Sequence, residues 1–444
     1  MSVIQQSLLR LSKTDSNSPA WLRDIQQRGR SVWGSHHWPT KKTEDWRYTN
    51  LSKLEKSDFF AGTHTVENIE VDSQAIKRVV DSAVIPELSA CRLVFVDGQY
   101  DEGLSDGACP PGLNKVLFSE ADSAQVERIQ AMLGSVVESG KHLFTSLNEL
   151  QLNEGLYLGV EKNTAISKAL HIVYVSTGST SSVNQRLLVD MAESSEFTVI
   201  EHFVSLNDAG NSFNNGASEF CLAGNAKLTH YRLNLETENS LHVGGVHAAL
   251  ERSAQLSSFY LALGSALKRI DVVVKFLGEG AHADVNGVYL PKNNQHVDFH
   301  TNLEHCVPNT TSNEVFRGII GDTAKAVFNG RIHIYPQAQK THAQLSNKNL
   351  LTSDKAEVNT KPELEIYAND VLCAHGATVA QLNDESMHYL RTRGVSTEEA
   401  QVMLSFGFIN ELIEKLDDQA ISDYLRPVIA GLFARDSDLT RHLL

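Results

Sequence analysis

The feature that most constrains the fold is a long stretch, from Gly155 to about Gln381, in which strand patterns recur and helical patterns are almost absent. Short β-rich runs such as Leu156–Val160 and Leu170–Val175 alternate there with polar turns. An ordinary parallel sheet needs helices to cover both of its faces, and this stretch offers none. The choice therefore lies between a β-sandwich and a solenoid.

A loose theme recurs within this stretch: a small or polar residue leads an alternating strand. The occurrences begin at Glu196, Ala226, Ala254, Ala281, Ala324 and Ala356. Their starting positions differ by roughly 27 to 43 residues, which is too irregular for a propeller but suits coils whose loops vary in length. The recurrence favours a solenoid. It predicts one continuous parallel β-helix with its apolar side chains stacked inward.

The end of the stretch carries the sharpest chemical candidate, Cys373 and His375. Glu363–Ala368 alternates like a strand with one buried face, Asn369–Asp370 is typical of a turn, and Val371–His375 predicts a second strand. Residues two apart on a strand share a face, so the thiol and the imidazole should point the same way. Such a pair can bind a soft metal, stabilise a thiolate, or serve packing alone. One Cys and one His do not complete a tetrahedral metal site.

Two other polar groups are weaker candidates. The first is a histidine and cysteine cluster, comprising His296, His300, His305 and Cys306. His300 and His305 are out of phase on a strand, which disfavours a shared metal. The second is a run of amide side chains at Gln344, Asn347 and Asn349, which we interpret as turn or stacking residues that satisfy backbone groups rather than as catalytic residues.

Composition narrows the functional class. Lys and Arg number 39 against 54 Asp and Glu, a formal charge of −15, which disfavours broad binding to nucleic acid or anionic membrane. No apolar run approaches the length of a membrane span, and the N-terminus lacks a signal-peptide pattern. The five cysteines include no CxxC pair, so we expect free thiols in a reducing cytoplasm. There is no Walker A, Rossmann, GxSxG or HExxH motif.

We expect three regions: a mainly helical N-terminal region over 1–145, a β-helix core over 146–389 and a helical C-terminal region over 390–444. Helical patterns cover Pro19–Trp33 and Ser123–Val137. Between them, Trp46 and Tyr48 are expected to anchor an N-terminal arm onto the body, although a recognition loop is an alternative.

The C-terminal region begins with a capping box, in which Ser396 is the N-cap and Glu399 lies three positions on. An apolar stripe follows at Val402, Phe406, Ile409, Ile413 and Leu416, with a second row beside it at Leu404, Phe408 and Leu412. So wide an apolar face exceeds what a coiled-coil seam needs. Either the body of the protein or a partner must therefore cover it.

Three segments resemble the SufB/SufD family of the SUF iron–sulfur assembly system. They are KTEDWRYTNL at 42–51, the run from Lys340 to Leu382, and RTRGVSTEEAQVMLSFGFINELIEKL at 391–416. The resemblance covers most of the chain and is densest from Arg331 to Leu416. SufB proteins carry a glutamate directly after the histidine that matches His375, and this chain has Gly376 there. It also lacks the N-terminal cysteine motif of SufB, so the resemblance is to the SufD branch.

The resemblance implies a right-handed parallel β-helix flanked by helical regions, in a non-catalytic scaffold that holds an iron–sulfur cluster only transiently. It implies a heterodimer with a SufB paralogue, and pairing of the chain with itself when isolated. The residue matching His375 lies at the SufB interface in this family and takes part in nascent cluster assembly, with Cys373 beside it. It further implies that the SufC ATPase docks on the C-terminal helices. The residues expected to contact this ATPase are Met403, Phe406, Phe408 and Ile409.

Two alternatives stay open at this stage. A β-helix enzyme such as a polysaccharide lyase needs clustered Asp, Arg or Lys along one face and secretion, and neither is visible in the sequence. A purely structural homodimeric partner differs from the scaffold only in whether Cys373 and His375 matter.

Overall fold

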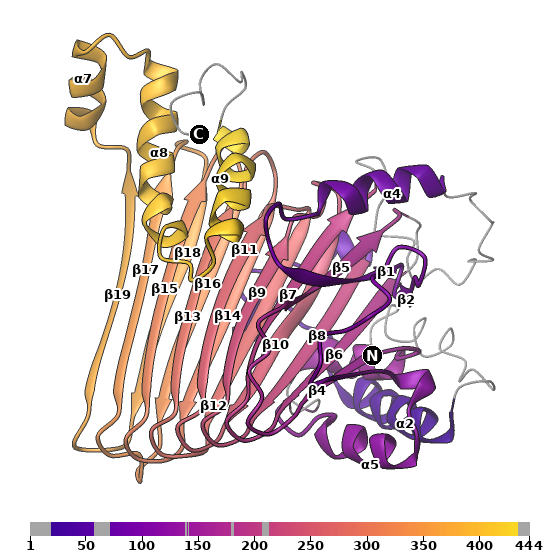
Figure 1. Ribbon diagram of the computed structural model, residues 1–444. Helices are drawn as coiled ribbons and strands as arrows, with labels where there is room; N and C mark the ends of the chain where they lie inside the picture. The colour runs from indigo at the N-terminus through magenta and orange to yellow at the C-terminus, as the bar shows by residue number, and fades with distance from the viewer. Residues whose placement is uncertain are drawn as a thin grey trace.

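The computed structural model describes residues 19–56, 72–137, 140, 142–178, 182–206 and 213–433, and these residues form a β-helix with helices at both ends (Figure 1). Two sheets make up its walls. Sheet A has the strand order β19-β17-β15-β13-β11-β9-β7-β5-β1-β2, and sheet B has the order β18-β16-β14-β12-β10-β8-β6-β4-β3. Successive strands from β4 onward alternate between the sheets, so each coil contributes one strand to each. The predicted parallel β-helix is confirmed.

The strands of sheet A are β1 (Ala90–Val96), β2 (Gln99–Tyr100), β5 (Ala169–Ser176), β7 (Glu196–Ser205), β9 (Lys227–Asn234), β11 (Gln255–Leu263), β13 (His282–Leu290), β15 (Thr311–Ile320), β17 (His342–Leu351) and β19 (Leu372–Gln381). Those of sheet B are β3 (Leu113–Leu117), β4 (Leu156–Val160), β6 (Ser182–Met191), β8 (Phe213–Leu222), β10 (Leu241–Leu250), β12 (Leu267–Phe276), β14 (His296–His305), β16 (Lys325–Ile334) and β18 (Glu357–Ile366). The helices are α2 (Ala20–Ser35), η1 (Glu44–Trp46), α3 (Ser52–Glu55), α4 (Ser73–Ser82), η3 (Phe118–Glu120), α5 (Ser123–Met132), α6 (Leu143–Leu150), α7 (Asp384–Thr392), α8 (Thr397–Ile413) and α9 (Gln419–Phe433).

Each strand pairs in parallel with the strand one coil away, whereas β1–β2 and β3–β4 are antiparallel. The coil length varies: Gln255 pairs with His282, 27 residues further on, and Lys325 pairs with Glu357, 32 residues further on. The widest interval in the sequence theme runs from Ala281, which precedes β13 of sheet A, to Ala324, which precedes β16 of sheet B. Two interleaved columns of strands therefore explain the irregular spacing.

The corners before the sheet A strands β9, β11, β13, β15 and β17 explain why a small residue leads the theme. A residue with a left-handed backbone conformation directly precedes the small one, and these residues are Asn225, Ser253, Gly280, Asn309 and Lys340. The alanines that follow, Ala226, Ala254 and Ala281, are fully buried. The chain thus turns sharply into the interior at each corner, where only a small side chain fits.

The interior combines apolar stacking with buried charge. Glu201 accepts hydrogen bonds from Arg232 at 3.0 Å and Ser218 at 2.8 Å, and His230 lies 3.1 Å from the same carboxylate. Burial alone would raise the pKa of Glu201, but Arg232 and His230 outweigh it and lower the pKa to about 2. A second network joins Glu236 to Lys268 at 2.8 Å. These charges are paired because an isolated buried charge is very costly.

Asn347 and Asn349 belong to this interior and not to a turn. Both are buried on β17. The Asn347 side-chain amide donates to the Tyr289 hydroxyl at 2.9 Å, and Asn349 donates to Asn347 at 2.6 Å and to the Thr378 carbonyl oxygen at 3.4 Å. The two amide side chains therefore hydrogen-bond each other, and Asn349 also hydrogen-bonds one backbone carbonyl group. Gln344, by contrast, is exposed.

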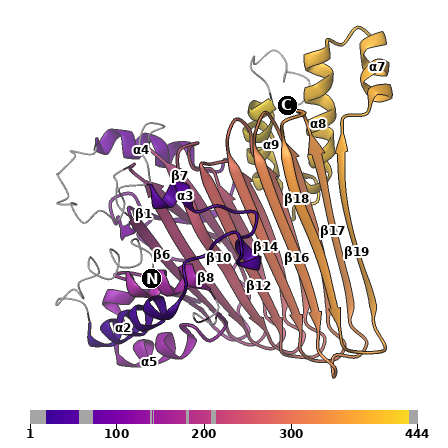
Figure 2. The ribbon, with the colours of Figure 1, turned by 180° about the vertical axis from the view of Figure 1, so that it is seen from behind.

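The N-terminal region packs on one end of sheet B and crosses its outer face (Figure 2). Helix α2 packs against α6. Residues 38–56, called the strap below, run across sheet B from β10 toward β18. Trp46 is buried as expected, whereas Tyr48 is 46% exposed and does not anchor the strap. Helix α5 is shorter than predicted because it ends at Met132, just before Gly134 adopts φ +78.

The C-terminal helices α8 and α9 lie against the outer face of sheet A, and α7 projects beyond it (Figure 1). Ser396 caps α8 by accepting a hydrogen bond from the Glu399 backbone at 3.1 Å, as predicted. Most of the apolar stripe belongs to one buried cluster with the outer face of sheet A, and Val402 is buried as well, so the body of the protein covers the stripe. None of the helices in the described ranges is long and apolar enough to cross a membrane.

Candidate functional site

Cys373 and His375 lie on β19, the last strand of sheet A. In the register of β17 with β19, Ala343 is opposite Cys373 and Leu345 is opposite His375. Ala343 and Leu345 are buried in the core, and Cys373 packs against the same cluster. His375, two residues on, shares this inward face. No further coil covers it among the described residues, so His375 is exposed although it lies on the inward face.

Cys373 and His375 offer two different kinds of ligand. Cys373 is half-buried. Burial raises the pKa of its thiol, and a hydrogen bond with the Ala343 backbone lowers this pKa by a smaller amount. The protonated thiol therefore dominates at neutral pH. His375 is open to solvent, and the neighbouring Gly376 has free space around it. The imidazole is thus the more available of the two ligands.

The terminal coil, formed by β18 and β19, leaves one edge of each sheet without a strand partner among the described residues. It also gathers exposed apolar side chains. Of the eight large hydrophobic residues that are exposed in the described chain, four lie between 366 and 379: Ile366, Tyr367, Leu372 and Val379. An open edge beside exposed apolar side chains is typical of an interface. The sequence analysis placed His375 at an interface but did not single out these four apolar side chains, although strand patterns end abruptly after Gln381.

Charged side chains on the outer face of the terminal coil are paired within the chain. Arg331 reaches Glu365 at 2.6 Å, and His333 lies 2.8 Å from the same carboxylate. The Arg331 guanidinium, with His333 as a second contributor, lowers the pKa of Glu365 to about 2. Lys325 similarly pairs with Glu357 at 2.5 Å. The groups left free for contacts at the terminal coil are therefore its strand edges and apolar side chains rather than these charged side chains.

The second histidine cluster does not converge on one point. His296 and His300 face outward from β14 beneath the strap, where His296 contacts Thr49 at 3.0 Å and His300 pairs with Asp298 at 3.1 Å. His305 faces inward and hydrogen-bonds Thr310 at 2.8 Å. No group of three metal-ligating side chains that could hold an ion occurs in the described part of the chain.

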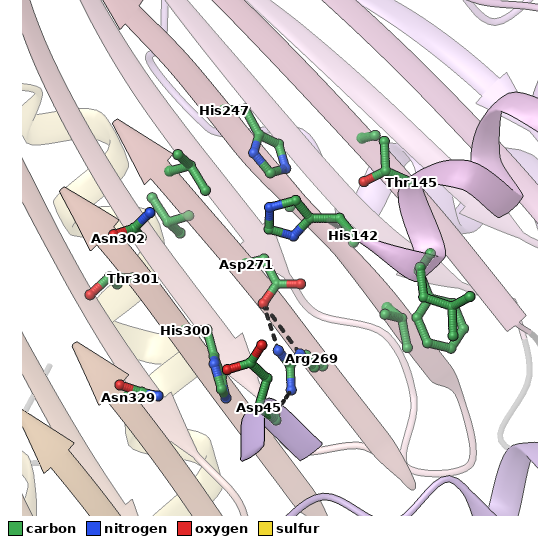
Figure 3. Close-up of a pocket in the computed structure, with 18 of the residues that line it drawn as sticks. Asp45, His142, Thr145, His247, Arg269, Asp271, His300, Thr301, Asn302 and Asn329 are labelled. Carbon is green, nitrogen blue, oxygen red and sulfur yellow. Dashed lines mark hydrogen bonds and ion pairs between the residues drawn. The ribbon is translucent and has the colours of Figure 1, made fainter. Parts of the chain in front are cut away.

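A cavity of about 250 Å³ lies between the strap and the outer face of sheet B (Figure 3). On its floor, Arg269 pairs with Asp271 at 3.1 Å and Asp298 at 3.2 Å, and its guanidinium lies 3.9 Å from the Trp46 ring centroid. Burial, with neighbouring cations, lowers the pKa of His247 well below its usual range, so this imidazole is neutral. Arg269 thus holds the strap at Asp45 and Trp46, within the KTEDWRYTNL segment.

The four residues expected to contact an ATPase divide into two pairs. Phe406 and Ile409 are buried against sheet A, beside residues such as Val288. Met403 and Phe408 are half-buried. The guanidinium of Arg317 lies 5.2 Å from the Phe408 ring centroid. Of the four residues, only Met403 and Phe408 remain partly accessible.

Comparisons with known proteins match nearly the whole chain. The family model "SUF system FeS cluster assembly, SufBD core domain" matches residues 174–408, and "SufBD protein N-terminal region" matches residues 10–172. The iron–sulfur cluster assembly protein SufD of Escherichia coli is 34% identical over 86% of this chain and 86% of its own length. A SufBD family protein of Synechocystis is 27% identical over 96% of this chain and 94% of its own length. SufD of Bacillus subtilis is 23% identical over 96% of this chain and 97% of its own length.

Proposed function

The chain belongs to the SufBD family of iron–sulfur cluster assembly proteins, and from this premise we propose that it is a scaffold subunit and not a catalyst. In this proposal the terminal coil pairs with a SufB-type paralogue, and His375 ligates a cluster that forms at the interface. The cluster is cargo that is passed on. The related proteins are named for assembly and not for polysaccharide chemistry, which removes the support for a β-helix enzyme.

The open terminal coil is the observation that carries this proposal. An edge strand exposes a row of unpaired backbone groups, and monomeric proteins usually protect such edges with charge, proline or a covering segment. Here the edge strands are β18 and β19. Leu372 and Val379 on β19 are 66% and 48% exposed, and Tyr367, which directly follows β18, is 59% exposed. The end coil of a second β-helix can cover these side chains and extend both sheets by main-chain hydrogen bonds.

The ligand chemistry suits transfer rather than storage. An imidazole and a thiolate both bind iron, and stable iron–sulfur centres generally use four protein ligands. In the described part of the chain, the terminal coil offers two such side chains, His375 and Cys373. The remaining ligands then come from the partner chain. A cluster held by few ligands from two chains can leave when the interface changes.

The C-terminal helices are proposed to receive a SufC-type ATPase. Helix α7 projects from the body and buries none of its residues (Figure 1). Tyr389 on α7 is 57% exposed, and Met403 and Phe408 on α8 are half-buried. We assign the docking contact to this accessible surface, while Phe406 and Ile409 hold α8 against sheet A. The three regions 1–145, 146–389 and 390–444 then correspond to cap, cluster-bearing core and ATPase attachment.

The experiment that tests the site is cluster loading in the assembled complex. His375→Ala should leave the complex intact, because an interface of standard size involves about 20–30 residues on each side. Iron and acid-labile sulfide per complex, isolated without oxygen, should fall severely. Cys373→Ser should have a smaller effect because its thiol is half-buried and protonated. His342→Ala is the matched control, since His342 is exposed on the neighbouring strand β17 but points to the outer face. Normal loading in His375→Ala would mean that the terminal coil acts through shape alone.

A further inference from the structure

Two cysteines come together at the N-terminal end of the solenoid, the opposite end from His375. Cys91 lies on β1 and is fully buried in the core, and Cys109 lies between β2 and β3, half-buried against the same cluster. The Cys91 thiol donates a hydrogen bond to the carbonyl oxygen of Ala108, the residue bonded to Cys109, at 3.4 Å. The two thiols also interact with each other: burial, with Cys109 as second cause, raises the pKa of Cys91 to about 11.

Hydrogen bonds hold the segment that leads to Cys109 against the strand that carries Cys91. The segment before Cys109 runs beside β1, where Asp106 accepts a hydrogen bond from the Arg92 backbone at 2.8 Å and returns one to the Arg92 carbonyl oxygen at 2.8 Å. The Ser105 hydroxyl accepts another from the Val94 backbone at 2.8 Å. A disulfide forms readily only between cysteines whose backbones already lie close together. These hydrogen bonds, with the contact of the Cys91 thiol to the residue before Cys109, bring the two backbone segments together.

The other cysteines differ in their surroundings. The side chains that shift the thiol pKa of Cys221 include Glu219, Asp190 and Arg128. Those that shift the thiol pKa of Cys306 are Glu304 and Lys275. No second thiol is among these neighbours. Cys91 and Cys109 thus lie beside another thiol, whereas Cys221 and Cys306 lie beside charged side chains.

We propose that Cys91 and Cys109 form a reversible disulfide by exchange with a low-molecular-weight disulfide such as oxidised glutathione. The Cys109 thiol is the accessible one, so it loses its proton and attacks one sulfur of the oxidant, and a glutathione thiolate leaves. The Cys91 thiol then loses its proton and attacks the Cys109 sulfur of the mixed disulfide, and the second glutathione leaves. Two protein thiols are oxidised and one glutathione disulfide is reduced to two glutathiones, so atoms and electrons balance.

The disulfide would close the loop of residues 92–108 over the N-terminal end of the core. Cys91 pairs in register with Leu170 on β5, the next strand of sheet A. Cross-linking this cover restricts the unfolded chain and stabilises the folded one. The terminal coil at the far end is left unchanged, so the oxidised chain retains the proposed cluster site.

The experiment uses the full-length chain, reduced and then treated with oxidised glutathione under native conditions. Intact-mass measurement should show a loss of about 2 Da and no retained glutathione, because exchange ends in an internal disulfide. A non-reducing peptide map should join the peptides that contain Cys91 and Cys109. Reduction with a dithiol should restore the original mass.

Variants separate the two steps. Cys91→Ser should stop at the mixed disulfide and keep one glutathione on Cys109, whereas Cys109→Ser should leave Cys91 unmodified because it is fully buried. Cys306→Ser, which removes a half-buried cysteine outside the pair, should still form the disulfide. Glutathione retained on Cys91 or Cys109 of the unaltered chain, free thiols at both Cys91 and Cys109 after treatment, or a cross-link between other cysteines would each overturn the proposal. The peptide map of the unaltered chain remains decisive even if a variant folds poorly.

Discussion

Leu372 offers the most direct test of the terminal coil as an interface. It begins β19 and is 66% exposed. Complete burial of a leucine side chain contributes about 1.5–3 kcal/mol, so covering the exposed two-thirds contributes roughly 1–2 kcal/mol to pairing. Leu372→Asp removes that gain and adds a carboxylate that must lose its hydration. Since about 1.4 kcal/mol is a tenfold change, the dissociation constant should rise at least about 5- to 30-fold.

The control is Leu277→Asp. Leu277 is 42% exposed and directly follows β12, three strands away from β18 in sheet B. The same change of side chain there should leave pairing unaltered. Titration calorimetry between the purified chain and a SufB-type partner gives both dissociation constants, and thermal melting confirms that each variant remains folded. Unchanged affinity in Leu372→Asp, or equal weakening in both variants, would show that the terminal coil is not the contact surface.

Further predictions concern the helical hairpin and the buried charges. Phe406→Ala should lower the free energy of unfolding by about 3–5 kcal/mol and make the C-terminal helices sensitive to proteolysis, because Phe406 packs on sheet A. Phe408→Asp should instead leave the fold intact and weaken ATPase binding, as measured by calorimetry. Arg232→Met removes the guanidinium that neutralises the buried Glu201 carboxylate, which keeps only its contacts with Ser218 and His230. Urea unfolding should show a loss of about 3–5 kcal/mol in the free energy of unfolding, and a loss below about 1 kcal/mol would contradict this. Because the folded pKa of Glu201 is depressed to about 2, the stability it contributes near neutral pH should disappear as the pH falls from about 4.3 toward 2. Glu314 is the opposite case: burial raises its pKa to about 8, so the protein should lose stability as the pH rises from about 4.3 to 8, and Glu314→Gln should flatten that slope in melting curves.

Local patterns in the sequence were enough to predict the architecture. Alternation with period two identifies strands, and the missing helical pattern between Gly155 and Gln381 leaves no cover for an open parallel sheet. The shared face of Cys373 and His375 also follows from local geometry, since it depends only on their spacing. The Ser396 cap could be predicted for the same reason, because the hydrogen bond joins residues three positions apart.

The tertiary structure decided which faces are covered. Glu201 and Arg232 look like solvent-facing residues of an alternating strand, yet they lie inside the solenoid, where neighbouring coils pair them. The apolar stripe of α8 had two candidate covers in the sequence, and only the folded chain shows sheet A against Phe406. His375 lies on the inward face but stays exposed because no described coil follows β19. Periodicity determines where a side chain points along its own strand, whereas burial depends on what a distant part of the chain places opposite it.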